Sequence, residues 1–332
     1  MVGIGKYHPE ALPARAAGRG RACPLCRAPV DRFGACGAGH AEVRAIGTTW
    51  SFRDFRDNLI VDVDAPVLAW RQDKGHRLGC ENSHEAVAWS LFRGVEVLGA
   101  AAAAFATEGP VELFFWGRHR DATPWAPLAD ARAALEEHIH GPDVNSAEPD
   151  LIVVDGGRRT VTFLDAHLAA PLCALRPPRW FAGAGTPAGF RRRRAILDGL
   201  LREEEGPHPF RRGLDEAIRR GFYAPARRLL LARACARRLG ADFRAEIVSL
   251  VNPVTMRNPM AEAARFAALL TPECASDYSC RTWADIWDRV PATAKGSKSV
   301  HDQTLAATLH DYLAARTVNR APARMLREVA PL

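Results

Sequence analysis

Two aspartates, Asp150 and Asp165, flank a predicted β-hairpin and are candidate ligands of a metal ion. The apolar runs Leu151–Val154 and Thr160–Leu164 have strand length, and the turn sequence Asp155-Gly156-Gly157 joins them. Because the two ends of a hairpin with matched arms lie side by side, we expect the aspartates to be near neighbours. Two carboxylates held close by strands suit a hard divalent cation such as Mg²⁺ or Mn²⁺.

A histidine follows the second aspartate at the next position but one. On a strand His167 points to the same face as Asp165. Imidazole titrates near neutral pH, so His167 is a candidate for general-base work or for positioning water. It is also a candidate third metal ligand, which would shift the preference toward Mn²⁺ or Zn²⁺. A third interpretation, a remnant of a decayed site, stays open.

A second set of ligands lies near the amino end and consists of Cys23, Cys26, Cys36 and His40. Three thiolates and an imidazole within a short segment are the ligands that tetrahedral Zn²⁺ prefers. No ligand position is vacant, so a structural zinc is favoured over a catalytic one. The segment has few apolar residues, so bound metal would have to stabilise its fold. In zinc-finger peptides the free energy of zinc binding is on the order of 10–16 kcal/mol. Unpaired surface thiols are the alternative.

The charge of the chain favours polyanionic partners. The formal net charge is +7 and the isoelectric point is about 9.2, with the basic excess almost all arginine. Arg191 and Arg192 open a four-arginine run that is a candidate phosphate-binding patch, with a solvated helix face as the alternative. The start of the chain has no apolar signal region, and no run spans a bilayer. Eight cysteines without such a signal indicate a reducing, cytoplasmic location.

The predicted elements form an α+β core in the order helix, strand, strand, strand, helix, strand. Besides the hairpin, the core comprises a helix capped by Asn82, the strand Val111–Trp116, the helix Tyr223–Leu239 and the strand Phe243–Val251. We expect a short strand at Pro66–Trp70 and helices after the core. The predicted domains are a zinc module at 1–45, a core at 46–255 with a basic insertion at 168–222, and a helical extension at 256–332.

The hairpin and its flanking residues resemble the PD-(D/E)xK nucleases, which have the restriction-endonuclease-like αβββαβ fold. Pro149-Asp150 stands where the family has Pro-Asp, and Asp165-Ala166-His167 stands where it has Asp/Glu-x-Lys. The resemblance covers roughly residues 81–251 and implies a metal-dependent DNA nuclease. It also implies an acidic third site residue on the first core helix, for which Glu85 is the candidate, with Glu81 in reserve. A capping role would explain Glu85 equally well.

The resemblance extends in part to the second core helix. Tyr223, Arg227 and Arg228 resemble a tyrosine–arginine helix of some bacterial members, although Ala224 takes the place of a glutamine found there. Arg227, and beside it Arg228, are therefore expected to contact nucleic-acid phosphate, with a surface ion pair as the alternative for Arg227.

The lysine of the family motif, which orients or activates the attacking water, is replaced by His167. Two further hypotheses therefore accompany the nuclease: a catalytically silent nucleic-acid-binding module on the same fold, and a zinc-stapled interaction protein with no nucleic-acid role.

Overall fold

A computed structural model describes the parts of the chain that carry most of the predicted core. The described residues are 44–46, 49–51, 55–61, 65–70, 78–80, 83–136, 149–168, 172, 197–202, 208–253, 256, 258–290 and 299–314. The predicted zinc ligands Cys23, Cys26, Cys36 and His40 lie outside these residues, as do Glu81, Arg191 and Arg192.

The chain divides into two compact units, which are described separately. Unit 1 comprises Met1–Ala106, Arg120–Ala122 and Trp283–Leu332. Unit 2 comprises Thr107–His119 and Thr123–Thr282. These boundaries differ from the predicted division at 45/46 and 255/256, because unit 1 draws on both ends of the chain.

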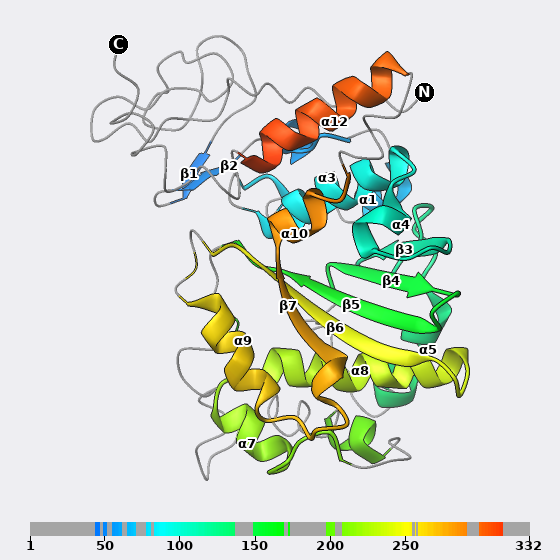
Figure 1. Cartoon of the computed structure of the whole chain (residues 1–332), viewed down its shortest axis with the longest axis vertical. Coiled ribbons are helices and arrows are strands. Elements are labelled where there is room, and N and C mark those ends of the chain that lie inside the picture. Colours follow the sequence, from blue (N-terminus) through cyan, green and yellow to red (C-terminus); the bar gives the residue numbers. More distant parts are fainter. Residues whose placement is uncertain are drawn as a thin grey trace. The chain divides into compact units, whose positions relative to one another are not determined.

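Unit 2 is built on a mixed sheet of five strands in the order β3-β4-β5-β6-β7 (Figure 1). Strand β4 is antiparallel to both of its neighbours, β3 and β5, and β6 and β7 add in parallel to β5. The strands are β3 Val111–Phe115, β4 Leu151–Asp155, β5 Thr160–Ala166, β6 Arg244–Val251 and β7 Tyr278–Thr282. The described part of the protein is thus mixed α and β, as predicted.

Helix α8, Tyr223–Leu239, covers one face of this sheet (Figure 1). Its buried leucines pack in one cluster with Val161 and Phe163 of β5 and Ile247 of β6. Burial of such side chains contributes roughly 1.5–3 kcal/mol each. Pro225 is tolerated because it lies in the first turn, where a backbone N–H would have no intrahelical acceptor. The other helices of unit 2 are α5 Ala126–Glu136, α7 Leu214–Arg219, α9 Pro259–Ala267 and the 3₁₀ helix η5 Ala275–Asp277.

Unit 1 is mainly helical around α3, His84–Val97, which is buried along most of its length. Helix α12, Val300–Leu313, packs on α3 at Gly94, where a Cβ atom would lie 2.3 Å from Leu309 Cδ1. The remaining elements are the hairpin of β1 Arg44–Ile46 and β2 Thr49–Ser51, the 3₁₀ helix η2 Phe55–Asn58, α1 Ala65–Trp70, α4 Ala101–Phe105 and α10 Trp283–Trp287.

The predicted order of core elements is observed along the chain as α3, β3, β4, β5, α8 and β6. Three local predictions are wrong or incomplete. The segment predicted as a strand at Pro66–Trp70 is helix α1. The cap of α3 is Ser83 rather than Asn82, since Ser83 Oγ accepts a hydrogen bond from the Ala86 amide at 3.1 Å. Strand β7 was not predicted.

Among the described helices, none combines the length and the apolar character needed to cross a bilayer.

Candidate functional site

The predicted hairpin is observed as β4 and β5, which pair antiparallel. Leu151 pairs with Leu164 and Asp155 with Thr160, so one further step in this register sets Asp150 opposite Asp165. The backbone of Asp150 is held from both sides: its amide donates to Leu164 O at 3.0 Å, and the Trp116 amide donates to its carbonyl at 3.3 Å. The sheet therefore fixes the chain at the first aspartate.

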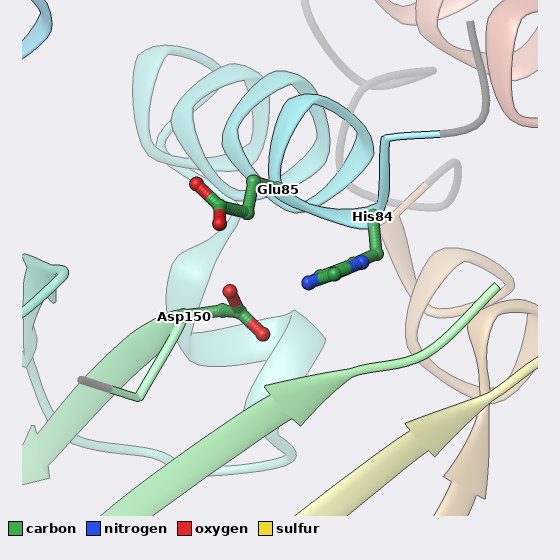
Figure 2. A group of neighbouring side chains, drawn as sticks. All are labelled: His84, Glu85 and Asp150. Atoms are coloured by element: carbon green, nitrogen blue, oxygen red, sulfur yellow. The ribbon is translucent and has the colours of Figure 1, made fainter. Parts of the chain in front are cut away.

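The carboxylate of Asp150 lies against the end of β5. Its Oδ2 accepts a hydrogen bond from the Ala166 amide at 2.7 Å, and the residue is 8% exposed. Figure 2 shows Asp150 directly before β4, with its side chain turned away from the strand. A charged acceptor strengthens such a bond. Because Ala166 follows Asp165 in the chain, this contact holds the first carboxylate next to the second aspartate.

Asp165 is buried, and its two carboxylate oxygens differ. The residue is 6% exposed, and Arg228 donates to Oδ2 from Nη1. Oδ1 is buried and has no hydrogen-bond partner among the described residues. Leaving a buried acceptor unsatisfied costs about 1–3 kcal/mol. A cation or a donor bound at Oδ1 would remove that cost.

Arg228 brings a positive charge to the aspartates from α8. Val161, Phe163 and Asp165 alternate along β5, so Asp165 faces the helix as the two apolar residues do. Burial lowers the pKa of Arg228 to about 10, and the negative charge of Asp150 opposes this shift. The guanidinium therefore stays charged at neutral pH and interacts with both carboxylates.

A small pocket adjoins this ion pair within unit 2. Its free volume is about 20 Å³, which is room for one water molecule or one small ion. Its polar wall comprises Asp165, His167, Arg228, Ser249 and Tyr278, and the remainder is mainly apolar, with Leu172, Phe222, Ala224, Pro225 and Phe266.

Two of the polar residues that line the pocket, Ser249 and Tyr278, come from β6 and β7, the two parallel strands beyond β5. Ser249 of β6 is the register partner of Asp165, and Tyr278 of β7 donates from its hydroxyl to Ser249 Oγ at 3.3 Å. Burial raises the pKa of Tyr278, so the phenol stays protonated and remains a donor.

Of the predicted site residues, the structure brings Asp150, Asp165, His167 and Arg228 to one region of unit 2. His167 is half-buried, lines the pocket, and donates from its backbone amide to Leu250 O at 2.7 Å. Arg227 is 6% exposed. Its predicted contact with phosphate stays a prediction.

Glu85 lies in the first turn of α3 and is 4% exposed, with His84 before it (Figure 2). A carboxylate in this turn also interacts favourably with the helix dipole. Glu85 belongs to unit 1 and the aspartates to unit 2, so its predicted role as a third site residue stays a prediction.

Sequence reasoning missed Ser249, Tyr278 and the pairing of Arg228 with Asp165. Ser249 does carry a signal, because it is a polar residue inside the apolar run of β6. Tyr278 carries none that we recognise.

Comparison of the chain with models of known families, with curated proteins and with solved structures finds no match.

Proposed function

We propose that this protein is a metal-dependent phosphodiesterase that cleaves DNA. The observation that carries the proposal is Oδ1 of Asp165, the residue opposite Asp150 across the hairpin: this oxygen is buried and has no hydrogen-bond partner among the described residues. A carboxylate oxygen without a donor is a site that a divalent cation satisfies.

The proposal includes a restriction-endonuclease-like core. It rests on the chain order helix, three strands, helix, strand, and on the Pro149-Asp150 and Asp165-Ala166-His167 sequences at the two ends of the hairpin. The mixed five-stranded sheet is compatible with this assignment and is also compatible with other α+β folds.

The residues present fit a divalent cation. Asp150 and Asp165 supply acidic oxygens, and Glu85 is the proposed third, outer group. A bound Mg²⁺ or Mn²⁺ would stabilise charge on the phosphate and lower the pKa of its bound water. His167 lines the pocket beside Asp165 and is the proposed group for orienting water or accepting its proton.

Zinc is proposed as a separate, structural metal. Cys23, Cys26, Cys36 and His40 would hold it, and elemental analysis of the purified protein tests this directly.

The test is plasmid cleavage by the full chain with Mg²⁺ and with Mn²⁺. We expect nicking or linearisation that EDTA abolishes. In Asp150→Asn, which loses the charge at unchanged size, we expect the rate to fall by at least about a hundredfold, as for removal of one transition-state-stabilising group. Cleavage that persists in EDTA, or that Asp150→Asn leaves intact, would contradict the proposal.

A catalytically silent DNA-binding module is the second candidate. Two observations favour it: His167 stands in place of the motif lysine, and Arg228 already engages Asp165. DNA binding by a wild-type protein that cleaves with neither metal would select this candidate. Cleavage restored by His167→Lys would show that the natural site has decayed.

A further inference from the structure

We infer that Arg228 is the cation of this site, and that it exchanges partners: it neutralises Asp165 in the metal-free protein and binds the substrate phosphate once a metal ion occupies Asp165. This inference rests on the proposed function and assigns to Arg228 the positive charge that the motif lysine would have supplied.

Arg228 is in direct contact with Asp165. Arg228 Nη1 donates to Asp165 Oδ2, and the side chains of the pair are only 17% and 9% exposed. Arg228 stays charged at neutral pH, and the planar fork of arginine matches phosphate as well as carboxylate. The site therefore contains a permanent cation in direct contact with a proposed metal ligand.

The net charge of the site changes sign when a divalent cation binds. Two carboxylates and one guanidinium leave a net charge of −1 around Asp150, Asp165 and Arg228. A divalent cation at Oδ1 of Asp165, which has no hydrogen-bond partner among the described residues, would change this to +1 and would compete with Arg228 for the same carboxylate. Arg228 thus weakens metal binding, and the metal in turn releases Arg228 for an anion.

The pocket gives the released guanidinium of Arg228 a place to bind an anion. Arg228 lines the pocket together with Asp165 and His167, and its Nε has no hydrogen-bond partner among the described residues. A phosphate oxygen at this position would satisfy a donor that the carboxylate leaves unused. The guanidinium would then hold the phosphate next to the metal ligands.

The experiment measures Mn²⁺ binding to the full chain by calorimetry, beside Mn²⁺-dependent plasmid cleavage. In Arg228→Gln we expect Mn²⁺ to bind about tenfold more tightly, because a cation in contact with a partly buried carboxylate is removed. In the same variant we expect the cleavage rate at saturating Mn²⁺ to fall by at least about a hundredfold. A structural role alone would not raise the metal affinity while lowering the rate.

Arg233→Gln is the matched control. Arg233 lies on the same helix and donates from Nη1 to Asp277 Oδ2 at 2.9 Å, with both side chains 20% exposed. It is the same kind of ion pair, and neither residue lines the pocket. We expect its Mn²⁺ affinity and cleavage rate to stay at the wild-type level.

If Arg228→Gln does not fold, Arg228→Lys tests the inference instead. The contact with Asp165 uses a single guanidinium nitrogen, so an ammonium can replace it. We expect wild-type Mn²⁺ affinity within about threefold and a cleavage rate within about tenfold. A loss of cleavage as large as that of Asp165→Asn would overturn the inference.

Failure of this inference and failure of the proposed function would give different results. If wild type binds and cleaves with Mn²⁺ but Arg228→Gln binds the metal no more tightly, the inference is wrong and the proposed function stands. If neither protein binds Mn²⁺, both are wrong. A larger rate loss in His167→Gln than in Arg228→Gln would assign the charge-stabilising role to His167 and overturn the inference.

Discussion

At the scale of single residues, the site depends on the unequal environment of the two oxygens of Asp165. One oxygen accepts from Arg228, and the other is buried without a partner among the described residues. Buried carboxylates in folded proteins normally have all their acceptors satisfied, and the exceptions mark strain or a missing ion. This asymmetry makes Asp165, rather than the better-satisfied Asp150, the residue whose charge most directly reports metal binding.

The sequence predicted that the two aspartates lie close together, but not the ion pair that Asp165 makes. The Asp155-Gly156-Gly157 turn and the matched arms sufficed to predict Asp150 near Asp165, because the two ends of a hairpin with matched arms lie side by side. The ion pair of Asp165 with Arg228 joins residues 63 positions apart, and its geometry depends on how α8 packs on the sheet. No local pattern contains that information.

At the scale of elements, the turn after β3 supports the start of the hairpin. Trp116 donates to Asp150 O, and the next residue, Gly117, has φ +74° and accepts from the Trp125 amide at 2.9 Å. A Cβ atom at Gly117 would lie 2.3 Å from Leu128 Cδ2, and Leu128 is buried. Both the backbone and the packing therefore require glycine here.

Gly117→Ala is accordingly expected to lower the free energy of unfolding by about 1–3 kcal/mol, measured by urea denaturation. Gly156→Ala is the control, since a Cβ atom at Gly156 would meet no other atom within 4 Å and the φ of Gly156 is not in the left-handed range. We expect that variant to stay within about 0.5 kcal/mol of wild type. Equal stabilities for the two variants would contradict the described turn.

The elements differ in how far their sequences determine them. Helix α8 was predicted with its observed bounds, because apolar residues that can face the core run from Leu229 to Leu239 and Gly240 ends the helix. The run at Ala65–Trp70 is short and apolar, and such runs do not distinguish a strand from a helix. Strand β7 has the sequence YSCRT, mostly half-buried, and lies at the edge of the sheet, so it lacks a hydrophobic pattern.

At the scale of the whole molecule, composition did not reveal how the chain divides. Helix α12 follows unit 2 in the sequence, yet it packs on α3 in unit 1, where Gly94 leaves room for Leu309. Predicted boundaries follow local changes in composition, whereas this packing joins residues more than 200 positions apart. The sequence therefore predicted the core as one continuous segment, whereas each compact unit combines separate segments of the chain.

The net charge of +7 leads to a prediction about DNA binding. We expect the affinity for a DNA duplex to fall about tenfold or more between about 50 and about 200 mM salt, because cations are released from neutralised phosphates. Fluorescence anisotropy measures this. Replacing Arg191 and Arg192 together by alanine should make the log–log slope shallower by about 1–2 if both contact phosphate. Absence of binding at low salt would instead favour the zinc-stapled interaction protein.

The proposed metal site is tested by comparing two aspartates of the same hairpin in the Mn²⁺ plasmid assay. Asp165→Asn removes the charge at the proposed metal site. Asp155→Asn removes a charge at the opposite end, where the side chain accepts from the Arg158 amide at 2.9 Å and an asparagine oxygen can do the same. We expect Asp165→Asn to lower the cleavage rate by at least about a hundredfold and Asp155→Asn to cleave like wild type. Equal rates in the two variants would contradict the proposed metal site.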